Sequence, residues 1–118
     1  MTAKDAVIAY SQAEKVKSGI IWVSQAVEML KGLPPQDLQG AETIIKPIVG
    51  FIANEVHLAK TLLKDNTWDD VAKKLDNAIV MINSGVAYES SHHLTQALSQ
   101  VTSVCQRAMT ELRAEGLI

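Results

Sequence analysis

Apolar residues recur every three or four positions along most of the chain, which is the spacing of one face of an α-helix. The clearest run extends from Ala3 to Lys31 and follows Thr2, whose hydroxyl can cap the first turn together with Asp5. Gly32 and two prolines after it predict the end of this helix. Its expected core positions are Ala6, Ala9, Ala13, Val16, Ile20, Val23, Val27 and Leu30.

A second helix is expected from Pro35 or Asp37 to about Lys64. Pro47 lies inside it, where the ring removes one backbone hydrogen bond and clashes with the preceding turn. The sequence therefore predicts a kink near residues 43 to 47. The expected core positions are Leu38, Ala41, Ile45, Ile48, Val49, Ile52, Val56, Ala59 and Leu63.

A shorter third helix is expected after a turn at residues 65 and 66. Thr67 and Asp70 repeat the capping pattern at its start. The helix runs to about Asn83, and Ser84 and Gly85 end it. Its expected core positions are Trp68, Val71, Ala72, Leu75, Ala78, Ile79 and Ile82.

The start of the last helix has two interpretations. Residues 86–91 fit a loop, and they also fit a first helical turn capped by Ser84. We favour a loop through about Ala87, followed by a helix to about Ala114. The expected core positions are Leu94, Ala97, Leu98, Val101, Val104, Cys105, Ala108, Met109 and Leu112.

Four helices joined by about three to eight residues favour antiparallel neighbours. We therefore predict one all-α domain over residues 1–118, an up-down-up-down four-helix bundle with its second helix kinked near Pro47. Hydrophobic residues make up 47% of the chain and aromatic residues only 4%, so the core must consist mainly of Ala, Val, Ile and Leu. Such side chains suit closely packed helices.

Composition and charge exclude several classes of function. The eleven basic and thirteen acidic residues alternate along the chain and give a formal charge of -2, so no nucleic-acid partner is expected. The longest apolar stretch is a few residues, far short of the roughly 20 that span a bilayer. A single cysteine and the lack of a secretory signal pattern predict a cytoplasmic location. Without a phosphate-binding glycine loop or zinc-type cysteine spacing, we expect no cofactor and favour a non-enzymatic role.

The first two helices have more apolar positions than their core faces require. On the second helix these are Ile44, Phe51, Leu58 and Leu62. They either pack within one bundle or form an interface with another helical protein or a second copy. Our working hypothesis is a non-catalytic protein that acts through self-association or protein–protein interaction. The contacts are expected at Ile8, Gly19, Trp22, Ala26, Met29, Phe51 and Leu58, because two small residues seven positions apart can leave a groove beside Trp22 and Met29.

His57 is a candidate phosphoryl acceptor because it lies off the core face, near small residues and lysines. His57 and Lys60 form a His-x-x-Lys sequence that resembles the motif of histidine phosphotransfer domains, which are also four-helix bundles. The resemblance covers four residues, and Thr61 and Leu62 stand where those domains usually have glycine and a small residue. It implies, as an alternative function, a phosphotransfer carrier that uses His57.

A metal-binding bundle is the second alternative. Glu89 and His92 have the Glu-x-x-His spacing of di-iron bundles, with His93 beside them. A di-iron site needs two such pairs and two more glutamates, and the chain has one pair, so we assign no metal ligand. Cys105 falls on a core face and is expected to be a buried thiol of low reactivity.

Overall fold

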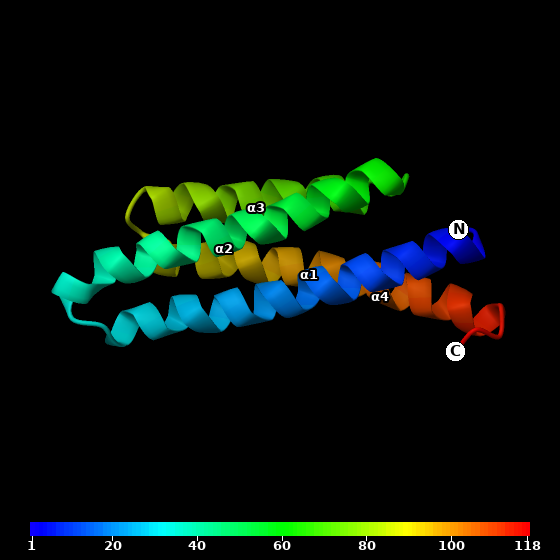
Figure 1. The fold of residues 1–118 in the computed structure, drawn as a ribbon, viewed down its shortest axis with the longest axis horizontal. Helices are drawn as coiled ribbons and strands as arrows, with labels where there is room; N and C mark the ends of the chain where they lie inside the picture. Colours follow the sequence, from blue (N-terminus) through cyan, green and yellow to red (C-terminus); the bar gives the residue numbers. More distant parts are fainter.

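A computed structural model of residues 1–118 shows four long α-helices and no strands. They are α1 (Ala3–Met29), α2 (Pro35–Leu62), α3 (Thr67–Asn83) and α4 (Ser91–Ala114); two short 3₁₀ turns, η1 (Leu30–Gly32) and η2 (Ala87–Ser90), lie between them. Each helix packs against its two neighbours in the ring α1–α2–α3–α4, and diagonal pairs scarcely touch. Consecutive helices run in opposite directions (Figure 1), so the predicted four-helix bundle is confirmed.

One hydrophobic core of 26 buried residues runs through the bundle and receives side chains from all four helices. All eight core positions predicted for α1 are buried. On α2 the prediction was wrong at Ile48, whose side chain is 39% exposed, because the adjacent Val49 points into the core and successive residues on a helix diverge by about 100°. Leu38, Ala41, Ile79, Leu98 and Met109 are half-buried at the edges of the core.

The two predicted caps have different outcomes. The Thr2 hydroxyl accepts a hydrogen bond from the Asp5 amide at 3.1 Å, which confirms the cap of α1. The prediction was wrong at Thr67, whose own amide donates to the Asp65 carboxylate at 2.9 Å. α3 begins at Thr67, one residue earlier than a cap at Thr67 would place it, so Thr67 is the first residue of the helix and not its cap. The Asp65 carboxylate thus holds the turn that leads into α3, and the N-cap residue, Asn66, makes no side-chain cap hydrogen bond.

The two uncertain segments are also resolved in part. α2 continues through Pro47 as one helix, and the kink at residues 43 to 47 stays a prediction. Residues 84 to 86 form the loop, the 3₁₀ turn η2 follows it, and α4 begins at Ser91, so the last α-helix starts later than the prediction of a loop through about Ala87 implied. Ser84 ends α3 and does not cap α4, which begins seven residues later.

Gly85 ends α3 in a left-handed conformation with φ +79°. The Val86 amide donates to the Met81 carbonyl and the Gly85 amide to the Ile82 carbonyl, the two hydrogen bonds of a Schellman cap.

We expect Gly85→Ala to lower the free energy of unfolding by about 1–2 kcal/mol, because an L-residue is strained at this φ. Gly32→Ala is the matched control, since Gly32 has no positive φ and open space around it. Urea unfolding followed by circular dichroism measures both; equal losses would contradict the assignment.

Candidate interaction surface

The exposed apolar side chains of α2 follow a regular pattern. Ile44, Ile48, Phe51, Leu58 and Leu62 are all exposed, and Glu55 occupies the remaining position. The spacings between these six positions alternate between four and three residues, which is the pattern of a coiled-coil seam. This α2 seam lies beside the core face of the helix. It gives α2 a second apolar stripe that no other part of the chain covers.

α1 adds two large side chains next to the α2 seam. Trp22 is 70% exposed and Met29 is 73% exposed, and they lie seven residues apart on one side of the helix. Gly19 allows the close approach of the two helices, because a Cβ atom there would lie 3.0 Å from Cγ1 of Ile52. A groove of about 220 Å³ follows this contact. It is lined by Lys15, Val16, Gly19, Trp22, Phe51, Ile52 and Glu55.

The antiparallel register makes these residues one surface. Trp22 and Phe51 line the same groove. Seven residues further along α1 lies Met29, and seven residues back along α2 lies Ile44, so these two side chains come level one heptad away. We call the combined surface the α1–α2 face. It consists of Trp22, Met29, Ile44, Ile48, Phe51, Leu58 and Leu62.

The one charge in the α2 seam is neutralised within the chain. The Glu55 carboxylate accepts a hydrogen bond from the Gln12 amide at 3.1 Å and pairs with the Lys15 ammonium at 3.5 Å. Gln12 also donates to the Glu55 carbonyl at 3.0 Å. The hydrogen bond from Gln12, with a smaller effect of Lys15 and against that of burial, lowers the pKa of the Glu55 carboxyl. Glu55 is thus ionised at neutral pH, and its charge is compensated.

The α1–α2 face is large for a monomer. If each of its seven side chains has roughly 150–250 Å² of surface, their exposed fractions leave on the order of 700 Å² of apolar area. The largest apolar patch on an ordinary monomer is about 300–600 Å². A standard protein interface buries about 800 Å² on each partner. The face therefore has the size of an interface.

The predicted contact residues divide into two groups in the structure. Trp22, Met29, Phe51 and Leu58 are exposed on the α1–α2 face. Ile8 and Ala26 are partly buried against the core, and Gly19 lies in the groove beside Ile52. The predicted contacts left out Ile44 and Leu62, which were named only as surplus apolar positions of the second helix, and they missed Ile48 and Glu55, which the alternating spacing of the α2 seam could have found.

His57 and Lys60 do not form a joint site. His57 is exposed on α2, and its carbonyl accepts a hydrogen bond from the Thr61 hydroxyl at 3.0 Å. The Lys60 ammonium pairs with the Asp69 carboxylate of α3 at 3.1 Å, so this cation is directed to α3 and not to His57. Phosphorylation of His57 stays a prediction.

The histidines near the start of α4 and the cysteine stand apart from the α1–α2 face. His92 is exposed and His93 is half-buried, with ring centroids 5.7 Å apart. No group of three His, Cys, Asp or Glu side chains is placed to hold a metal ion.

Cys105 is buried as predicted. Its Sγ donates to the Glu14 carboxylate at 2.9 Å, and burial followed by Glu14 raises the pKa of the thiol to about 11. Such a thiol is a poor nucleophile at neutral pH.

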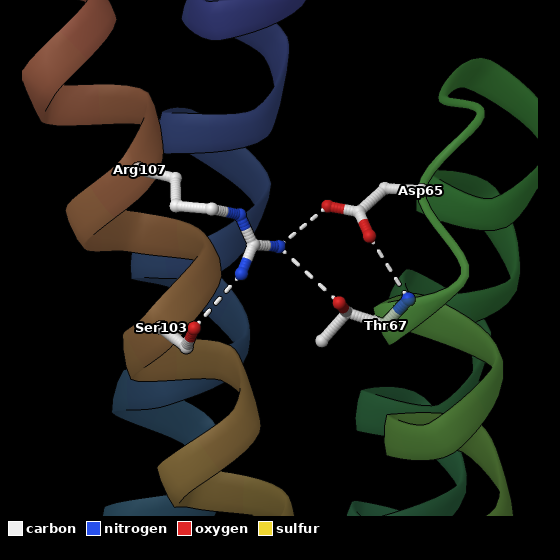
Figure 2. A network of polar contacts seen from close by, with 4 residues as sticks. All are labelled: Asp65, Thr67, Ser103 and Arg107. Carbon is white, nitrogen blue, oxygen red and sulfur yellow. Dashed lines mark hydrogen bonds and ion pairs between the residues drawn. The ribbon is translucent and has the colours of Figure 1, made fainter.

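A polar network joins α4 to the α2–α3 connection. One Arg107 nitrogen, Nη2, donates to the Asp65 carboxylate at 2.7 Å and to the Thr67 hydroxyl at 3.2 Å, and Nη1 donates to the Ser103 hydroxyl at 2.8 Å (Figure 2). The network borders a polar pocket of about 610 Å³ beside Asp5. Because Arg107 is occupied by partners within the chain, we assign it a structural role.

This network makes the stability dependent on pH. Burial raises the pKa of the Asp65 carboxyl, but the hydrogen bonds from Thr67 and Arg107 outweigh burial and lower the pKa below its ordinary value. The ionised carboxylate therefore stabilises the fold above about pH 4, and this contribution is lost as the pH falls through the lowered pKa.

We expect Asp65→Asn to lose about 1 kcal/mol of unfolding free energy at pH 7, since the network is partly exposed. The difference from the original protein should shrink below about pH 4. Asp76→Asn is the control, because it removes an exposed carboxylate that has no ion pair. Urea titrations at pH 7 and pH 3 measure the effect, and a difference that grows at pH 3 would contradict the expected sign.

Comparison of the chain with protein-family models, with curated proteins and with solved structures gave no match. None of the four helices combines the length and the apolar character needed to span a membrane.

Proposed function

We propose that this protein is a helical assembly module that binds a second copy of itself through the α1–α2 face. The observation that supports the proposal is the α2 seam, in which five large apolar side chains are exposed at coiled-coil spacing. Leaving these side chains in water forgoes about 25 cal/mol per Å² of apolar surface. Association is the ordinary way for a helical protein to cover such a stripe.

The charge of the face favours a second copy as the partner. Glu55 is paired with Lys15, and the heptad position next to the α2 seam on its open flank is uncharged throughout: Gly40, Pro47, Asn54 and Thr61. A basic or acidic partner would find no complementary charge there. A second copy presents the same neutral apolar surface, and a two-fold dimer pairs one patch with itself.

Trp22→Glu tests the proposal. We expect the original protein to dimerise in the micromolar range, and we expect the variant to dimerise at least about 100-fold more weakly, because an unpaired carboxylate would be buried in the interface. The helix content should stay unchanged, since Trp22 is 70% exposed. Sedimentation equilibrium gives the dissociation constants, and circular dichroism gives the helix content.

Val80→Glu is the matched control for this experiment. Val80 is an apolar residue on α3 with an exposure of 57%, and it lies outside the α1–α2 face. The control should dimerise like the original protein. A monomeric original protein over the whole concentration range would refute self-association, and an equal loss in both variants would refute the choice of surface.

A further inference from the structure

The arrangement of the two copies follows from the α2 seam, provided that the self-association proposed above takes place. We infer that α2 pairs with α2 of the second copy in antiparallel orientation, with the two-fold axis next to Phe51 and Glu55. This geometry uses all six positions of the seam at once. The three arguments for it concern symmetry, charge and register.

The first argument is symmetry. The six seam positions are spaced evenly about residue 53, so an antiparallel pair with its axis there matches each position to another position of the seam. Ile44 then faces the partner's Leu62, and Ile48 faces the partner's Leu58. Phe51 faces the partner's Glu55. Four of the six layers are therefore entirely apolar, and no seam residue is left outside the contact.

The second argument is charge. A parallel pair in register would place Glu55 against the partner's Glu55, and two carboxylates would repel each other in the centre of the contact. The Lys15 and Gln12 side chains on each copy are already used by one carboxylate. In the antiparallel pair each carboxylate keeps both partners and lies beside an aromatic ring, whose edge is electropositive. Glu55 thus disfavours the parallel arrangement.

The third argument is register. Sliding the antiparallel pair by one heptad in one direction brings Leu62 against the partner's Asp37. Sliding it in the other direction moves Ile44 and Ile48 beyond the end of the partner's α2 at Leu62. Both shifts lose apolar layers. On the flank of the seam, Trp22 and Met29 lie level with Phe51 and Ile44, so they can cover the same contact.

Distances between spin labels test the arrangement. Single cysteines replace Asn54, Thr43 or Thr61 in a Cys105→Ala background; all three positions are exposed on the side of the α2 seam away from α1. With the axis near residue 53, two labels at position 54 are offset by only about 3 Å along the helices. Labels at position 61 are offset by about 24 Å and labels at position 43 by about 30 Å.

We expect the shortest dipolar distance for Asn54→Cys and much longer ones for the other two variants. A mixture of Thr43→Cys and Thr61→Cys should recover a short distance, since these positions face each other across the axis. Three equal short distances would show a parallel dimer and overturn this inference while self-association stands. A dimer with three long distances would overturn the inference together with the proposed surface. The absence of any dipolar signal, with a monomeric mass, would instead refute self-association itself.

Discussion

Replacing Trp68 with alanine is expected to lower the free energy of unfolding by about 3–5 kcal/mol. Trp68 is fully buried, and it is the largest buried side chain in a core built mainly from small and aliphatic residues. The bundle has few other large side chains that could move into the cavity. Because a chain of this size is stabilised by roughly 6–18 kcal/mol in total, the substitution removes a large part of its stability. Urea unfolding followed by circular dichroism measures the loss.

Trp68→Phe separates the volume of the side chain from its polar atom. The Trp68 indole nitrogen is buried without a hydrogen-bond partner, so its N–H gains nothing in the folded state. Phenylalanine removes that donor and keeps most of the ring volume, and we expect a loss of only about 1 kcal/mol. If alanine and phenylalanine cost the same, the cavity argument is wrong for this site.

Periodicity was sufficient for most of the core because the helices are long. On α1, the eight predicted core positions from Ala6 to Leu30 are all buried. An error of one residue in the helical register would have turned every later position out of the core, so agreement along the whole helix fixes its core face. The failure at Ile48 has the same physical origin. Ile48 and Val49 are both apolar, so the core pattern alone accepts either neighbour, and only the spacing of the second apolar stripe assigns Ile48 to the α2 seam.

The polar contacts could not be predicted because they depend on how distant segments meet. Gln12 and Glu55 are 43 residues apart, and Asp65 and Arg107 are 42 residues apart. The helical pattern of each segment is compatible with many rotations of its neighbour. The exposure of Trp22 was predictable because it lies off the core stripe of α1. The role of Glu55 was not, because in the sequence it is an ordinary polar residue, and only the structure shows its contacts with Gln12 and Lys15.

Trp22 can report the proposed self-association directly. The chain has two tryptophans, so Trp68→Phe leaves Trp22 as the only one. In the monomer the Trp22 indole is 70% exposed to water, which gives red-shifted emission and ready quenching by iodide. As the concentration rises and the α1–α2 face is covered, we expect the emission to shift to the blue and the quenching to fall. Fluorescence titration from nanomolar to micromolar protein measures the transition.

Phe51→Glu in the same background should abolish the concentration dependence. Phe51 is 64% exposed and lies across the groove from Trp22, so the substitution adds a second carboxylate to the α2 seam next to Glu55 without removing a core contact. Lys15, the cation that lines the groove, is already paired with Glu55. Burying the new charge should weaken dimerisation by about 3 kcal/mol or more, which is at least about 100-fold. Val80→Glu should leave the transition in place. A blue shift that persists in Phe51→Glu would mean that Trp22 becomes buried by contacts other than those of the α2 seam.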